Sequence, residues 1–283
     1  MADERTISIV GLPGSGKTTF LAALWDGVSR PVSPDQLTLE SLPEERKYLT
    51  EIHERWLSCK PTPYTRQGQG VTSLRLSLRA GDQPPFELVI PDIAGEAFNE
   101  LWEKRSWSDG LRDISAAAGG LLVFIHAGDI VTMHPLVIEA ELPAEHATEA
   151  EEDAEAPIPW DPATAPTQIK VIDLIQSITG LHGPSTPPLA IVLSAWDTAE
   201  SEGVEPAEFL AMKMPMLAQY LKANSRMEHH IFGLSAQGGD VEADDEAERL
   251  RKIAPPAARV KVVDGSSASS EIARPLSWLL ERV

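Results

Sequence analysis

The residues best suited to chemistry lie near the start of the chain, in segment 11–19, which reads Gly-Leu-Pro-Gly-Ser-Gly-Lys-Thr-Thr. It matches the phosphate-binding pattern G-x-x-x-x-G-K-T. Its glycines allow a concave turn with inward-pointing N–H groups, and a helix beginning there adds the positive end of its dipole. Lys17 can then reach β- and γ-phosphates, and the Thr18 hydroxyl can bind Mg²⁺. The predicted phosphate-binding residues are Pro13, Gly14, Ser15, Gly16, Lys17, Thr18 and Thr19.

A second motif, Asp-Ile-Ala-Gly at 92–95, closes a short apolar segment farther along the chain. The Asp92 carboxylate can hold Mg²⁺, usually through water, opposite Thr18. Gly95 can bring a backbone N–H against a γ-phosphate, where a side chain would obstruct the approach. The pair therefore predicts a site that responds to the terminal phosphate of a nucleotide.

Two further motifs are suited to reading a purine base. Asp197, in Ser-Ala-Trp-Asp at 194–197, can accept from both guanine N1–H and N2–H₂, whereas adenine offers no such pair of donors on that edge. Nucleotide-binding folds commonly have N-K-x-D there, so Ala195 stands in place of a lysine. Trp196 could cover the base, but core packing is the favoured interpretation. The backbone at Ser-Ala-Gln, 235–237, can donate to guanine O6. The predicted base-binding residues are Ser194, Asp197, Ser235 and Ala236.

Apolar segments that predict strands alternate with segments of helical periodicity. This order predicts an α/β fold, a three-layer P-loop NTPase sandwich whose mostly parallel sheet has one antiparallel edge strand and helices on both faces. Each motif follows a strand, and ligands bind at the carboxyl ends of such strands. The predicted strands are 7–10, 73–79, 86–90, 121–125, 189–193, 231–234 and 259–263, and the predicted helices are 17–28, 43–58, 97–118 with an interruption at Gly110, 167–181, 206–223 and one capped by Ser269 or Ser270.

Residues 1–283 are interpreted as a single domain with two insertions. Segment 128–166 is acidic and rich in proline, which predicts an insertion that is partly disordered. Segment 240–258 is charged and without clear periodicity, and it is interpreted as a second insertion.

Composition argues against several functional classes. The net charge of −19 argues against binding to nucleic acid or to an anionic membrane surface, because both require basic surface. No apolar stretch reaches 18 residues, so no membrane span is expected. Cys59 is the single cysteine of the sequence, which leaves no internal disulfide and favours a cytoplasmic location.

Taken in order, these motifs resemble a TRAFAC-class GTPase, and their details are similar to bacterial double-GTPase proteins. The similar segments are 11–25, 194–197, 233–239 and 274–280. The resemblance implies a cytoplasmic switch that binds GTP, GDP and Mg²⁺. It also implies a place in bacterial multi-protein systems, with a GTPase-activating or effector protein as partner.

The resemblance also assigns roles to two positions near the phosphates. A loop threonine usually completes the Mg²⁺ site, and Thr65 is preferred over Thr62 and Thr72 because its loop is long and flanked by turn residues. Glu96 occupies the position of the glutamine that orients water in Ras-like proteins. An ionised carboxylate cannot donate a hydrogen bond, so either hydrolysis is slow and awaits a partner or another group orients the water. The candidate catalytic residues are Lys17, Glu96 and Thr65, and the candidate metal ligands are Thr18, Thr65 and Asp92.

Three functions remain in competition. The first is a GTP-hydrolysing switch, and the second is a nucleotide-gated scaffold with negligible hydrolysis. The third is an ATP-using P-loop enzyme, against which Asp92, Gly95 and Asp197 argue.

Overall fold

A computed structural model describes residues 5–31, 33, 36–61, 73–91, 96–132 and 161–283. The strands of this part of the chain form one sheet in the order β2-β3-β4-β1-β5-β6-β7-β8-β9. Strands β4, β1, β5, β6 and β7 run parallel to one another, which confirms the predicted α/β fold. The strands are β1 (Arg5–Gly11), β2 (Leu37–Leu39), β3 (Leu74–Ala80), β4 (Phe86–Ile90), β5 (Gly120–His126), β6 (Leu189–Ser194), β7 (His229–Ser235), β8 (Lys261–Asp264) and β9 (Ser267–Ser269).

The antiparallel part of the sheet differs from the prediction. Both β3 and β8 run antiparallel to the central strands, and neither lies at an edge. The edges are β2 and β9, each three residues long. Strands this short show no period-2 pattern, so the single antiparallel edge strand predicted from the sequence was wrong in number and place.

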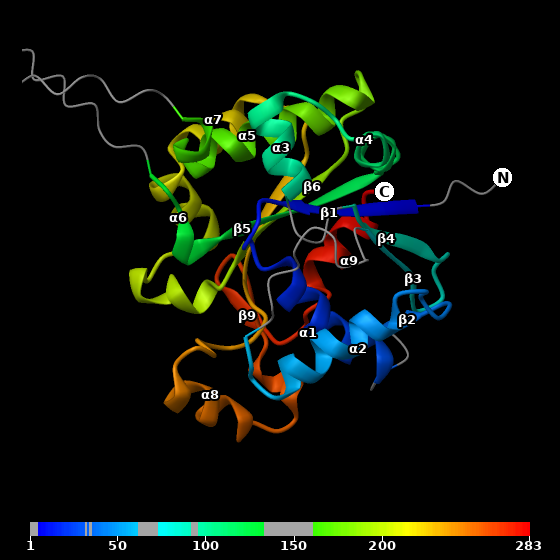
Figure 1. Ribbon diagram of the computed structural model, residues 1–283, viewed down its shortest axis with the longest axis vertical. Coiled ribbons are helices and arrows are strands. Elements are labelled where there is room, and N and C mark those ends of the chain that lie inside the picture. Colours follow the sequence, from blue (N-terminus) through cyan, green and yellow to red (C-terminus); the bar gives the residue numbers. More distant parts are fainter. Residues whose placement is uncertain (1–4, 32, 34–35, 62–72, 92–95, 133–160) are drawn as a thin grey trace, which may run out of the picture.

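Helices cover both faces of the sheet. Figure 1 shows α3 to α7 on one side and α1, α2 and α9 on the other, as the two large apolar clusters also indicate. Helix α8 packs separately, against Cys59. The helices are α1 (Lys17–Ser29), α2 (Arg46–Leu57), α3 (Glu96–Lys104), α4 (Asp109–Ala116), α5 (Thr167–Thr179), α6 (Pro206–Lys213), α7 (Pro215–Ala223), α8 (Asp244–Arg251) and α9 (Arg274–Leu280).

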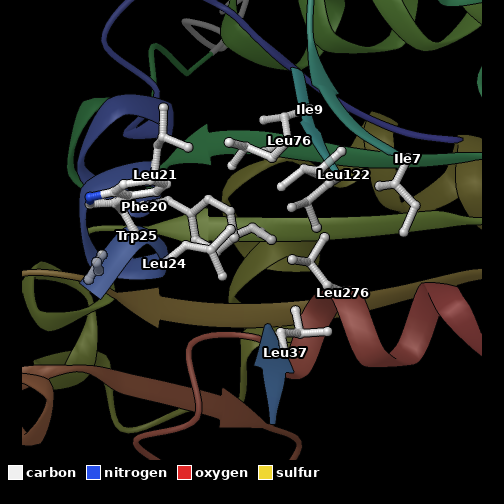
Figure 2. Packing of buried hydrophobic residues seen from close by; sticks show 14 of the residues in the cluster. Ile7, Ile9, Phe20, Leu21, Leu24, Trp25, Leu37, Leu76, Leu122 and Leu276 are labelled. Atoms are coloured by element: carbon white, nitrogen blue, oxygen red, sulfur yellow. The ribbon is translucent and has the colours of Figure 1, made fainter. Parts of the chain in front are cut away.

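Side-chain alternation along the central strands explains the two layers. Ile7 and Ile9 point to the α1 side of the sheet, whereas Val10 belongs to the cluster on the opposite face. Figure 2 shows the α1 side, where apolar residues of α1 pack against β1, β3, β5 and α9. This packing fixes the first turn of α1, which contains the last residues of the phosphate-binding segment, relative to the sheet. The labelled residues are Ile7, Ile9, Phe20, Leu21, Leu24, Trp25, Leu37, Leu76, Leu122 and Leu276.

Several predicted boundaries need correction. The expected helix 97–118 is two helices, because α3 ends at Lys104 and Arg105 adopts a left-handed φ of 54°. The break therefore precedes Gly110, which lies inside α4. The expected helix 206–223 is also two, because Pro215 has no N–H to continue α6.

The last third of the chain departs from the prediction in two more places. Segment 240–258 contains α8, although its sequence showed no clear period. The final helix begins at Arg274 after Ala273, so neither Ser269 nor Ser270 caps it. Ser269 instead ends β9.

Candidate nucleotide-binding site

Segment 11–18, called the P-loop below, connects β1 to α1 through two glycines in left-handed backbone conformations. Gly14 has φ 72° and Gly16 has φ 87°. A Cβ at Gly14 would meet nothing within 4 Å, whereas a Cβ at Gly16 would lie 2.7 Å from Ser194 Oγ. Position 16 therefore requires glycine for its conformation and for space, and position 14 for its conformation alone.

We expect alanine substitutions at these two glycines to differ in cost. Gly14→Ala adds only the left-handed strain of about 1–2 kcal/mol to the free energy of folding. Gly16→Ala adds a steric clash as well, for a total of about 2–5 kcal/mol. Urea denaturation of the two variants and the unaltered chain measures the difference, and equal losses would contradict the close approach to Ser194.

Lys17 is the first residue of α1, and its side chain is 3% exposed. Its ammonium donates to the carbonyl oxygens of Gly11 (2.8 Å) and Leu12 (3.0 Å). These bonds hold the charge beside the P-loop backbone, where the loop N–H groups and the positive end of the α1 dipole add to it. The local geometry therefore suits an anion carrying several oxygen atoms.

The carboxyl ends of β6 and β7 bring two of the predicted base-binding residues together. The Ser235 hydroxyl donates to the Asp197 carboxylate and accepts from the backbone N–H of Gly238 at 3.1 Å. Asp197 is thus held in place by β7 although it follows β6. Ser194 has a different task, because its hydroxyl donates to the carbonyl of Ser15 at 2.8 Å and so ties β6 to the P-loop.

Removing the Ser235 hydroxyl should loosen Asp197 without removing the carboxylate. We expect Ser235→Ala to weaken GDP binding by about 3- to 10-fold, the size of one hydrogen bond. Isothermal titration calorimetry measures the change. Ser29→Ala is the control, because Ser29 is exposed and is the last residue of α1, at the end of this helix away from the P-loop. Unchanged affinity in Ser235→Ala would contradict the supporting role given to the hydroxyl.

Trp196 packs in the core, as the sequence analysis favoured. Its side chain is 3% exposed and lies edge-on to Phe209, with ring centroids 5.3 Å apart. A Cβ at Gly233 would lie 2.5 Å from Trp196 Cδ2, so the indole lies directly on β7. The residue that reaches the site is Ala195, which adopts a left-handed backbone with φ 49°.

The loop after β7 is held by α2, which the sequence did not reveal. The indole N–H of Trp56 donates to the Ala236 carbonyl at 2.9 Å, and the Gln237 amide donates to the Trp56 carbonyl at 3.2 Å. The Arg259 guanidinium lies over the indole, 4.4 Å from the ring centroid, and donates to the same Trp56 carbonyl. Burial lowers the pKa of Arg259. These contacts fix the peptide group between Ala236 and Gln237, within the segment 235–237 whose backbone was predicted to donate to a base.

The P-loop and the segments that follow β6 and β7 line one pocket of about 590 Å³ along the carboxyl edge of the central strands. A pocket of this size is typical of small-molecule and cofactor sites. Predicted site residues form much of its lining. They are Gly14, Ser15, Gly16, Lys17, Thr18, Thr19, Ser194, Asp197, Ser235 and Ala236.

Sequence reasoning missed other residues of the lining. His126 ends β5, and a polar residue closing an apolar strand at the carboxyl edge of the sheet was a usable signal. Lys60 and Pro61 follow α2, and segment 239–242 precedes α8; neither had a signal in the sequence. Ala195 and Gln237, which belong to the two predicted base-binding motifs, also line the pocket. The additional lining residues are Lys60, Pro61, His126, Asp129, Thr198, Leu234, Gly239, Asp240, Val241 and Glu242.

Some predicted residues are not part of this pocket or cannot be placed. Pro13 is not among the residues that line it. Thr65, with its alternatives Thr62 and Thr72, lies outside the described residues, as do Asp92, Gly95 and most of the predicted acidic insertion. Glu96 begins α3, but its side chain is also outside the described part.

One of the three predicted metal ligands, Thr18, lies among the described residues. Within the described ranges, no group of three or more His, Cys, Asp or Glu side chains could hold a metal ion. Thr18 does line the pocket beside the P-loop, and the predicted set of hydroxyl and carboxylate oxygens suits Mg²⁺. In the part of the chain that the structure describes, no helix combines the length and apolar character needed to cross a membrane.

Comparison with known proteins gave a family match over most of the chain. A family model described as Double-GTPase 1 matches residues 8–279. No curated protein was found to match the sequence.

Solved structures with some likeness were found as well. A bacterial selenocysteine-specific elongation factor, EF-Sec, is 13% identical with a TM-score of 0.36, covering 87% of this chain and 28% of its own. The signal recognition particle receptor complex SRb-GTP/SRX from Chaetomium thermophilum is 14% identical with a TM-score of 0.39, covering 88% and 98%. A variant of Era from Aquifex aeolicus bound to GDP and AlF4⁻ is 15% identical with a TM-score of 0.38, covering 87% and 56%. The chain thus spans little more than a quarter of the elongation factor.

Proposed function

Since this chain belongs to the Double-GTPase 1 family, we propose that it is a Mg²⁺-dependent molecular switch that binds and hydrolyses GTP. Membership of a GTPase family implies binding of guanine nucleotides. The observation that carries the proposal is one pocket lined by both the P-loop and the Asp197–Ser235 pair. A phosphate-binding loop alone would suit any nucleoside triphosphate, and it is the second element that favours guanine.

Within the pocket, each residue would have a separate task. The P-loop N–H groups and the Lys17 ammonium would bind the β- and γ-phosphates. Asp197 would accept from guanine N1–H and N2–H₂, and the backbone N–H of Ala236 would donate to O6. Ser194 would act indirectly, because its hydroxyl holds the P-loop carbonyl of Ser15. Pro13 would shape the loop and not contact the ligand.

Mg²⁺ would be held by oxygen ligands from Thr18, Thr65 and Asp92, and when bound it would neutralise charge on the β- and γ-phosphates. Of these ligands, Thr18 supports the proposal from the pocket lining, and the other two remain predictions. The segments carrying Thr65 and Gly95 would respond to the γ-phosphate and change state after hydrolysis.

The switch would act through a protein partner in a bacterial multi-protein system. The sequence supports this view, because Glu96 stands where Ras-like proteins have a glutamine, and an ionised carboxylate in that place would not donate a hydrogen bond to water. Hydrolysis would then be slow until a partner supplies an orienting group. The same residue supports the second candidate, a scaffold whose nucleotide state controls binding and whose hydrolysis is negligible. We further propose that residues 1–283 act as one GTPase domain in the cytoplasm.

The proposal is tested by loading the chain with radiolabelled GTP and following a single turnover with and without Mg²⁺. We expect one guanine nucleotide bound per chain and slow release of phosphate that stops when Mg²⁺ is chelated. A chain that retains GTP unchanged over many hours would support the scaffold. A chain that binds no guanine nucleotide would contradict both.

A further inference from the structure

The imidazole of His126 is the feature of the pocket that the proposed function leaves unexplained. His126 is the last residue of β5 and lines the pocket. Its Nδ1 atom is fully buried and has no hydrogen-bond partner among the described residues. A buried polar atom without a partner costs free energy, so the position of this ring calls for a reason other than stability.

The neighbours of His126 leave this residue as part of the pocket lining. In the sheet it pairs with Ser194, and Ala195, the residue after Ser194, lines the same pocket with a side chain of a single methyl group. On the other side, a Cβ at Gly128 would come within 3.4 Å of His126 Cε1 and 3.0 Å of Thr198 Oγ1. Glycine at 128 therefore keeps space open between the imidazole and Thr198. Because Nδ1 is enclosed, the ring nitrogen that can bond a pocket ligand is Nε2.

Strand order indicates which part of a nucleotide would meet this ring. The P-loop follows β1, and the Asp197–Ser235 pair follows β6 and β7. Strand β5 lies between β1 and β6, and neighbouring strands are about 4.8 Å apart. A nucleotide with its phosphates on the P-loop and its base at Asp197 must cross the end of β5 with the part that joins them.

We infer that His126 Nε2 donates a hydrogen bond to the ribose or the α-phosphate of the bound nucleotide and so positions it in the pocket. This inference rests on the proposed function. It adds a residue that contributes to affinity without selecting the purine or the number of phosphates. The ribose and the α-phosphate are common to GDP, GTP and ADP.

Two variants separate the hydrogen bond from the shape of the side chain. His126→Leu keeps the bulk without a donor, whereas His126→Gln places an amide N–H at about the reach of Nε2. We expect His126→Leu to weaken GDP and GTP by the same factor of about 3- to 10-fold. Its preference for GDP over ADP should not change, and His126→Gln should bind within about twofold of the unaltered chain. Calorimetry with the three chains and GDP, GTP and ADP measures these values.

The results distinguish this inference from the proposed function. If the unaltered chain binds GDP and both variants bind it equally well or lose affinity equally, the inference is wrong and the proposed function stands. A loss confined to GTP, or a changed preference between GDP and ADP, would also overturn it. If the unaltered chain binds no guanine nucleotide, the proposed function and the inference both fail.

A measurement on the unaltered chain tests the same inference without depending on whether the variants fold. Diethylpyrocarbonate modifies accessible imidazoles, and peptide mass spectrometry reports the extent at each histidine. We expect GDP to slow modification of His126 and to leave His229, at the opposite end of the strands, unchanged. Equal modification of His126 with and without saturating GDP would overturn the inference.

Discussion

Lys17→Ala is expected to lower the affinity for GTP by about a hundredfold or more. The ammonium is almost fully buried against the P-loop backbone, where it can offer charge-assisted hydrogen bonds to phosphate oxygens. Each such bond to a charged group contributes about 1.5–3 kcal/mol, so the loss of two accounts for the expected change. Titration with a fluorescent GTP analogue in the presence of Mg²⁺ measures it.

Two matched variants show whether the charge is the cause. Lys17→Met keeps the length of the side chain and should lose as much affinity as Lys17→Ala. Lys222→Ala removes an exposed lysine of α7 and should bind as the unaltered chain does. Melting temperatures confirm that the variants are folded. Near-normal GTP binding by folded Lys17→Met would contradict the role of the ammonium.

The second large effect is expected at Asp197, and it concerns selectivity. Asp197→Ala removes the acceptor for two guanine donors, so GDP affinity should fall by about a hundredfold or more while the weak binding of ADP hardly changes. The ratio of the two affinities, measured by calorimetry, isolates the base from the phosphates. A loss shared equally by GDP and ADP would mean that Asp197 supports the fold of the pocket and does not read the purine.

Asp197→Asn offers a test in which binding is gained. An amide can accept from a base N1–H and donate to a carbonyl at C2, which xanthine has in place of the guanine amino group. We expect this variant to prefer xanthosine diphosphate to GDP, whereas the unaltered chain prefers GDP. Retention of the GDP preference in the folded variant would contradict direct contact between Asp197 and the base.

Most of the fold could be predicted because the pattern of apolar residues identifies each central strand from its own sequence. Alternation places Ile7 and Ile9 on one face and Val10 on the other, and continuous apolar runs such as 121–125 indicate strands covered on both faces. The three-residue edge strands β2 and β9 have no such pattern. Their pairing depends on neighbours that are already in place, so it could not be predicted from local sequence.

The candidate site was predictable where a motif is local and not where it depends on distant contacts. The P-loop is a continuous segment whose glycines and lysine are all suited to binding phosphate, so the motif can be found in the sequence alone. By contrast, the bond from Trp56 to the Ala236 carbonyl joins residues 180 positions apart, and the periodicity of α2 indicated only that Trp56 is buried. Ser194 was predicted to bind the purine base, but in the structure its hydroxyl donates to the P-loop carbonyl of Ser15. The roles of Thr65, Asp92, Gly95 and Glu96 remain predictions.

Competition between GTP and ATP for the pocket tests the central claim most directly. The chain is first loaded with a fluorescent GDP analogue in the presence of Mg²⁺, and each unlabelled triphosphate is then added in increasing concentration. We predict that GTP displaces the analogue at a concentration at least about a hundredfold lower than ATP, because Asp197 accepts two bonds that adenine cannot donate. Displacement by GTP and ATP at the same concentration would contradict a guanine-reading switch.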